Sequence, residues 1–148
     1  MLLNDAIQLA AKAHDGQVDK GGNPYILHPL RVMLSCENDS DRICAVLHDV
    51  VEDTGISLLQ LADMGYPDEV LHALECLTKR EGEGYDAFIN RILPNNTACR
   101  VKLADLRDNM DLSRIDNPTP ADLLRLDRYR RAEKQILDVV GSSAQKSL

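Results

Sequence analysis

Apolar residues recur with a helical period along almost the whole chain, and no segment shows the sustained apolar–polar alternation of a β-strand. The first segment carries its pattern on a single helical face formed by Ile7, Ala10, Ala11 and His14. Asn4 can cap this helix, which we expect to end near Gly16. Because the same period continues to the last segment, the sequence predicts an all-α fold.

Capping residues, prolines and glycines divide the rest of the chain into further helices. After the loop KGGNPY, Pro29 is expected to open the second helix, with His28 at the junction before it. The expected caps of later helices are Asp39, Ser57 and Thr119. The later helices are expected at about 40–53, shortly after residue 57, and at 67–78, 85–93, 97–112 and 120–141. We therefore expect a single bundle of about eight helices over residues 1–141, followed by a disordered tail at 142–148.

Length and apolar content are those of one ordinary domain. The chain has 148 residues, of which 44% are hydrophobic, and a chain of this size needs no disulfide or structural metal to fold. The four cysteines, at positions 36, 44, 76 and 99, include no CxxC pair. We therefore expect them to be free thiols.

The charge of the chain limits its partners. A net charge of −7 argues against a general binder of nucleic acid or of an anionic membrane. No stretch approaches the ~20 apolar residues of a membrane span, and the first residues lack the features of a signal peptide, so we expect a cytoplasmic protein. Residues 1–99 carry 7 basic and 16 acidic side chains, whereas residues 100–148 carry 10 and 8. This asymmetry suits a phosphate substrate between an acidic and a more basic half, and a solvated basic helix explains it equally well.

Polar chemistry is densest in HDVVEDT at 48–54. His48 and Glu52 lie one helical turn apart, and so do Asp49 and Asp53. The helix before them is largely apolar, so these carboxylates are costly unless a cation or a water-filled cleft receives them. Acidic residues at a helix C-terminus also oppose the helix dipole, which argues against a merely solvated helix end.

One imidazole and one carboxylate do not complete a hydrolytic metal site, which usually has three or four protein ligands and a position for water. The best further candidates are His28 in YILHPL and Asp105 in VKLADLRDN, because each polar group is embedded in an apolar run. Two imidazoles and two carboxylates would suit manganese, iron or zinc.

Four segments in the same order along the chain resemble the HD-domain metal-dependent phosphohydrolases, and among them the hydrolase domain of RelA/SpoT homologues, especially the stand-alone small alarmone hydrolases. The matching segments are 13–32, 45–54, 77–85 and 101–115. The resemblance implies an all-α HD domain with one metal ion, usually Mn²⁺. The implied metal ligands are His28, His48, Asp49 and Asp105.

The resemblance also implies a reaction. Glu52 and Asp53 match the acidic pair of the family, which positions and deprotonates the attacking water. In small alarmone hydrolases the reaction releases pyrophosphate from the 3′ position of guanosine tetra- or pentaphosphate and leaves GDP or GTP. No synthetase-like segment follows residue 141, so we expect a hydrolase-only protein.

Substrate-binding positions match the family less evenly. The matching residues are Lys20, Asn109, Arg125 and Tyr129. An exposed basic helix is an alternative reading of the segment that holds Arg125 and Tyr129. Lys79 and Arg80 follow the pair Leu77-Thr78, and from that position they could contact a terminal phosphate of the substrate.

The loop GQVDK departs from the family pattern. The family typically has an Arg-Lys pair against the base, and this chain has Asp19 and Lys20. A carboxylate cannot stack as a guanidinium does, although it can accept hydrogen bonds from the guanine edge.

Three functions therefore stay open at this point. The first is a manganese-dependent alarmone hydrolase, and the second is an HD phosphohydrolase that acts on another phosphorylated nucleotide or dinucleotide cofactor. The third is a non-catalytic nucleotide-binding module, which the clustered carboxylates and imidazoles argue against. The expected partner is a small nucleotide, with no nucleic acid and no membrane, and the sequence leaves the oligomeric state open.

Overall fold

The computed structural model describes residues 2–146, with side chains for residues 2–141. Within this part of the chain there are eight α-helices, one short 3₁₀ helix (η1) and no β-strand, so the predicted all-α class is confirmed. The bounds are α1 Leu2–Ala13, α2 Leu27–Leu34, α3 Asp39–Asp53, α4 Leu58–Asp63, α5 Asp68–Leu77, α6 Tyr85–Ile92, α7 Asn96–Asn109, η1 Leu112–Arg114 and α8 Pro120–Lys146.

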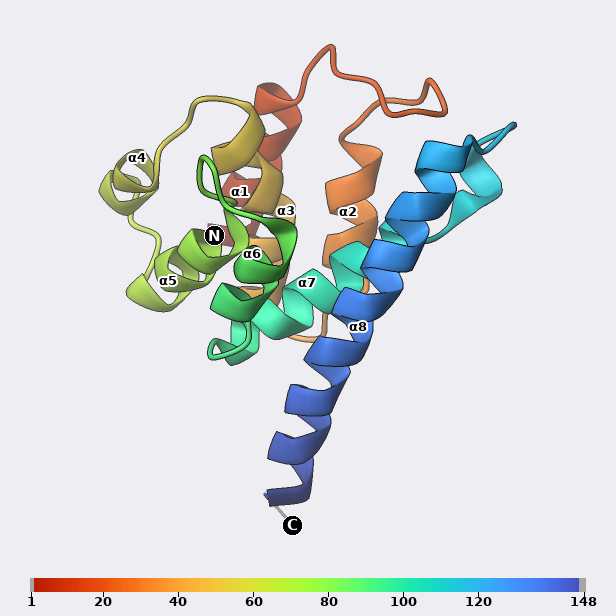
Figure 1. Cartoon of the computed structure of the whole chain (residues 1–148). Coiled ribbons are helices and arrows are strands. Elements are labelled where there is room, and N and C mark those ends of the chain that lie inside the picture. The colour runs from red at the N-terminus through yellow and green to blue at the C-terminus, as the bar shows by residue number, and fades with distance from the viewer. Residues whose placement is uncertain (1, 147–148) are drawn as a thin grey trace.

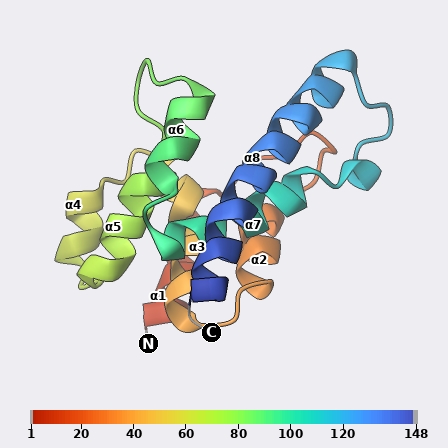
Figure 2. The ribbon, with the colours of Figure 1, turned by 60° about the horizontal axis from the view of Figure 1, so that its bottom comes forward.

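Helix α3 lies at the centre of the bundle and packs against α1, α2, α5 and α7 (Figure 1). Residues 43–48 of α3 are all buried, because an uninterrupted apolar run lets every side of this helix face a neighbour. The long helix α8 packs along α7, and its C-terminal end projects beyond the rest of the bundle in Figure 1, whereas Figure 2 shows the bundle after a turn of 60° about the horizontal axis. The start of α2, the end of α3 and the C-terminal half of α7 lie close together, because His28 and His48 both contact Asp105.

The first two helices differ from the predicted boundaries. Helix α1 begins at Leu2, so Asn4 lies inside the helix and is not its cap, and the helix ends before Gly16, which has a φ of 84°. Helix α2 begins at Leu27, so His28 lies within the helix and not at a junction. Proline is tolerated in a first turn because the amide there has no partner within the helix, which is why Pro29 need not be the first residue.

Local capping explains most other boundaries. Asn38 caps α3 by accepting from the Asp41 amide, so the predicted cap at Asp39 is one residue late. Ser57 caps α4 as predicted, in a reciprocal capping box with Gln60. Helix α7 ends at Asn109, earlier than predicted, because the chain turns there into η1.

The last helix is longer than the sequence predicted. It begins at Pro120 as expected but continues through Gly141 to Lys146. A single glycine costs only about 1 kcal/mol in a helix and does not end one by itself, so the predicted end at residue 141 is wrong. Residues 147 and 148 of the predicted tail lie outside the described residues, and the domain boundary stays a prediction.

Two further expectations can be compared with the structure. No helix in the described part of the chain is long and apolar enough to cross a membrane. All four cysteines are free thiols, as the absence of a CxxC pair predicted, and the thiols of Cys44 and Cys99 are buried.

Candidate metal centre and adjoining cavities

Three helices bring four predicted ligands to one place. His48 and Asp49 lie near the end of α3, His28 lies near the start of α2, and Asp105 lies on α7. Ligand atoms of His28, His48 and Asp49 all fall within 4.8 Å of one another. Asp105 joins them through Oδ1, which is 2.9 Å from Nε2 of His28 and 3.2 Å from Nε2 of His48.

Both imidazoles are oriented by hydrogen bonds on their far side. The Nδ1 group of His48 donates to the carbonyl oxygen of Ala45 at 2.5 Å, and that of His28 donates to Oδ2 of Asp108 at 2.6 Å. With Nδ1 held in this way, both Nε2 atoms point toward the carboxylates. A polar partner on the outer nitrogen is the usual arrangement behind a histidine that ligates a metal.

The pKa values of these groups are shifted by the charges of their neighbours. Burial alone would lower the pKa of His28, but Asp105 and Asp108 raise it to about 9. Burial also opposes the charge on His48, yet Asp49 and Asp105 raise its pKa to about 10. The carboxyl of Asp105 is buried as well, which would raise its pKa, but Lys102 and the imidazoles hold that pKa well below its usual range.

The donor set fits a divalent cation. The nearby carboxylates favour positive charge at both imidazoles, and a divalent ion would supply that charge with the same nitrogen and oxygen atoms as its ligands. Mixed imidazole and carboxylate ligands suit first-row transition metals. The sequence prediction of a metal site is therefore supported for His28, His48 and Asp49, and Asp105 lies next to them.

A cavity of about 290 Å³, here called the metal-side cavity, opens beside this cluster. The predicted acidic pair Glu52 and Asp53 lines it. Partial desolvation, together with the neighbouring charge of Asp49, raises the pKa of both carboxyls. The other lining residues are Tyr25, His28, Asp49, Lys79, Tyr85, Phe88, Lys102, Asp105, Asn109, Arg128 and Tyr129.

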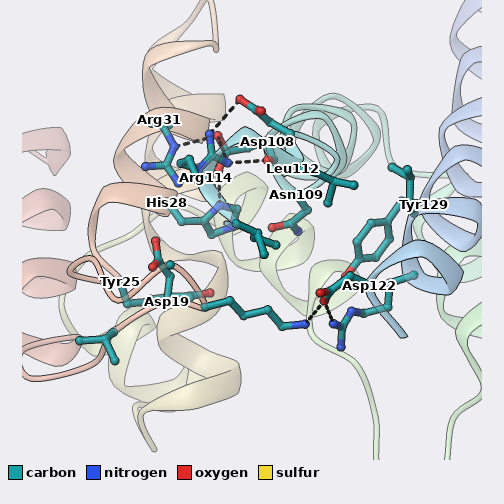
Figure 3. A pocket seen from close by; sticks show the side chains of 17 residues that line it. Asp19, Tyr25, His28, Arg31, Asp108, Asn109, Leu112, Arg114, Asp122 and Tyr129 are labelled. Atoms are coloured by element: carbon teal, nitrogen blue, oxygen red, sulfur yellow. Dashed lines mark hydrogen bonds and ion pairs between the residues drawn. The ribbon is translucent and has the colours of Figure 1, made fainter. Parts of the chain in front are cut away.

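Figure 3 shows a second cavity of about 300 Å³, here called the loop-side cavity. It lies between the loop after α1, the end of α7, η1 and the start of α8. The two cavities share the side chains of Tyr25, His28, Asn109 and Tyr129. The two cavities are therefore neighbours, and the metal-side cavity is the one lined by Asp49 and Asp105.

The predicted substrate-binding cations meet at one buried carboxylate in the loop-side cavity. Lys20 donates to Oδ1 of Asp122 at 2.7 Å, and Arg125 pairs with the same oxygen (Figure 3). Asp122 also closes the N-terminus of α8, since its Oδ2 accepts from the Thr119 amide at 2.8 Å. The predicted Asn109 lies where the cavities join, and its amide donates to Oδ1 of Asp105 at 3.3 Å.

The remaining residues that the sequence singled out lie at different places in the structure. Asp19 lines the loop-side cavity, but its Oδ1 accepts from the Asn23 amide at 2.9 Å and so also holds the loop. Lys79 lines the metal-side cavity, whereas Arg80 lies near Glu75 and lines neither cavity.

Sequence reasoning missed several polar residues of the site. Tyr25 donates to Oδ2 of Asp49 at 2.5 Å, and Lys102 pairs with Oδ2 of Asp105 at 3.0 Å. Lys102 precedes Asp105 by one turn of α7, a spacing that could have revealed it. Asp108 follows Asp105 by one turn of the same helix, but its contact with His28 on α2 depends on how the two helices pack.

The chain is similar in sequence to GTP pyrophosphokinases and to guanosine-3′,5′-bis(diphosphate) 3′-pyrophosphohydrolases. A probable GTP pyrophosphokinase of Mycobacterium leprae is 29% identical over 98% of this chain, which spans 19% of that relative. A guanosine-3′,5′-bis(diphosphate) 3′-pyrophosphohydrolase of Haemophilus influenzae is 31% identical over 88% of this chain, which spans 20% of that relative. The chain thus covers about a fifth of the length of these relatives. No protein-family model matches the chain.

A solved structure is similar over nearly the whole fold. It is that of a metazoan ortholog of SpoT that hydrolyzes ppGpp, and it superposes with a TM-score of 0.75 at 26% sequence identity. The match covers 93% of this chain and 84% of that chain. Because both shares are large, the two proteins have similar folds throughout and not only a common motif.

Proposed function

We propose that this chain, a distant homologue of the RelA/SpoT hydrolase domain, is a metal-dependent phosphohydrolase that releases pyrophosphate from the 3′ position of guanosine tetra- or pentaphosphate. The solved relative that hydrolyzes ppGpp supports the substrate class. The pyrophosphohydrolases among the longer relatives support the position of cleavage.

One structural observation carries the proposal. The ligand atoms of His28, His48 and Asp49 lie within 4.8 Å of one another, and Glu52 and Asp53 line the cavity beside them. Hydrolysis of a phosphate ester needs positive charge near the phosphoryl oxygens and a base near the attacking water. This arrangement has residues for both tasks.

His28, His48, Asp49 and Asp105 would hold the metal, for which we propose Mn²⁺. A divalent ion at this place supplies positive charge that polarises a phosphoryl oxygen and makes water more acidic. Asp108 and the Ala45 carbonyl hold the outer nitrogens of the imidazoles, so the ligands keep their orientation without rearrangement.

Glu52 and Asp53 would orient the attacking water and accept its proton. Their raised pKa values suit this task, because a carboxylate that takes up a proton more readily is a better general base near neutral pH. Both side chains are exposed to the cavity, so the proton can pass on to solvent after the reaction.

The nucleoside end of the substrate would occupy the loop-side cavity. Asn109 and Tyr129 line both cavities and would fix the ligand where they join. Lys20 and Arg125 would bind the phosphate groups on the nucleoside, in exchange for part of their contact with Asp122.

The proposal is tested by a panel of substrates with Mn²⁺ supplied. It should contain guanosine tetraphosphate, reduced dinucleotide phosphates and ordinary nucleotides. We expect guanosine tetraphosphate to have the highest kcat/KM. A higher value for a dinucleotide phosphate would contradict the assigned substrate and favour an HD phosphohydrolase of different specificity.

A further inference from the structure

The metal-side cavity is also lined by polar groups that the proposed reaction does not use. Tyr85 at the start of α6 and Arg128 on α8 both line this cavity. The hydroxyl of Tyr85 and Nε of Arg128 are buried and have no hydrogen-bond partner within the described part of the chain. Two such atoms at one cavity are unusual, because leaving a buried polar atom unpaired costs about 1–3 kcal/mol.

The side chain of Arg128 is held in a way that leaves its hydrogen-bonding edge available. Its guanidinium lies over the ring of Tyr85, with Cζ 4.6 Å from the ring centroid, and Cζ is 5.9 Å from the ring centroid of Tyr129. Stacking occupies the face of a guanidinium, whereas its N–H groups lie in the plane. No salt bridge to Arg128 is found among the residues whose side chains are described.

Two lysines on the same cavity add positive charge. Lys102 is nearly buried and shares its charge with Asp105, and Lys79 is exposed at the cavity. Together with Arg128, they place three cationic side chains around a cavity that the carboxylates Glu52 and Asp53 also line. An anion that extends from the metal centre into this cavity would therefore meet donors that are otherwise unpaired.

We infer that Arg128 and Tyr85 form an anion-binding subsite for the outer phosphate of a diphosphate, next to the phosphoryl group that is attacked. The hydroxyl of Tyr85 and the guanidinium of Arg128 would donate to this outer phosphate, with Lys79 adding charge. The inference rests on the proposed function and deepens it, because the subsite favours hydrolysis of diphosphate esters over monophosphate esters.

The most direct test measures binding of inorganic pyrophosphate and inorganic phosphate to the Mn²⁺-loaded protein, with free Mn²⁺ held equal in all arms. We expect the unmodified protein to bind pyrophosphate at least roughly tenfold more tightly than phosphate. Arg128→Met should reduce this ratio about tenfold. Arg130→Met is the matched control, because Arg130 is exposed on the same helix and lines neither cavity.

A second variant guards against a purely structural effect. Tyr85→Phe keeps the aromatic ring under the guanidinium and removes only the unpaired hydroxyl. The variant should bind pyrophosphate several-fold more weakly and GDP with unchanged affinity. Its melting temperature should not fall, because the substitution removes a buried polar group that has no partner. Equal binding of both anions by the unmodified protein, or unchanged ratios in both variants, would overturn the inference.

This test separates the subsite from the proposed reaction. Selective pyrophosphate binding that depends on Arg128, in a protein that does not hydrolyse guanosine tetraphosphate, would leave the subsite standing and remove the proposed function. Hydrolysis with unchanged pyrophosphate binding in both variants would keep the function and remove the subsite.

Discussion

Nδ1 of His28 lies 2.6 Å from Oδ2 of Asp108, on the side of the ring that faces away from the metal centre. Asp108 also accepts from Nε of Arg31 at 2.8 Å. Partial burial alone would raise the pKa of Asp108, but His28 and Arg31 lower it to about 2. Asp108 is therefore an ionised carboxylate that fixes the orientation of His28.

Replacement of Asp108 should weaken metal binding without touching a ligand. Asp108→Asn removes the negative charge that keeps Nδ1 of His28 a hydrogen-bond donor. We therefore expect the affinity for Mn²⁺ to fall by about 10–100-fold. A competitive chelator titration measures this change, with Asp116→Asn as an exposed acidic control from the same region. Equal affinities in the unmodified protein and Asp108→Asn would show that Asp108 does not support His28 as a ligand.

Glu52→Gln should separate binding from chemistry. The amide keeps the size of the side chain but cannot take up a proton from water, so kcat should fall by at least roughly 100-fold. Affinity for Mn²⁺ and for the nucleotide should stay within a few-fold of the parent. Steady-state kinetics together with a metal titration test this prediction, and a nearly unchanged kcat would remove Glu52 from the reaction.

The acidic motif was the most predictable part of the site. His48, Asp49, Glu52 and Asp53 are close in sequence, so the helical period alone places them at one helix end. Burial of His28 and Asp105 in apolar runs also indicated polar partners, although only the packing of α2 and α7 against α3 shows which ones.

Contacts between distant segments could not be read from the sequence. Lys20 and Asp122 are 102 positions apart, and their ion pair depends on how the loop after α1 meets the start of α8. Arg128 resembled any charge on a solvated basic helix, because its burial beside Tyr85 is set by the packing of α8. Gly141 misled the boundary prediction, since a helix tolerates one glycine.

Asp19 should act on the loop and not on the identity of the base. Its Oδ1 accepts from the Asn23 amide, while its own amide donates to the Asn23 carbonyl at 2.8 Å. Asp19→Ala should therefore lower kcat/KM for guanosine and adenosine substrates alike by a few-fold. Asp19→Asn keeps an acceptor oxygen and should resemble the parent. The measurement is the ratio of guanosine to adenosine kcat/KM. A selective loss of guanosine substrates in Asp19→Ala would instead assign base recognition to this carboxylate.

We propose that the cluster formed by His28, His48, Asp49 and Asp105 binds a metal ion that is required for release of pyrophosphate from guanosine tetraphosphate. The most direct measurement is product analysis by phosphorus NMR with protein stripped by a chelator, protein reloaded with Mn²⁺, and reloaded His48→Ala. We expect GDP and pyrophosphate in equal amounts from the reloaded parent alone. Undiminished products from the stripped protein or from His48→Ala, or no products from a parent that holds one equivalent of Mn²⁺, would contradict it.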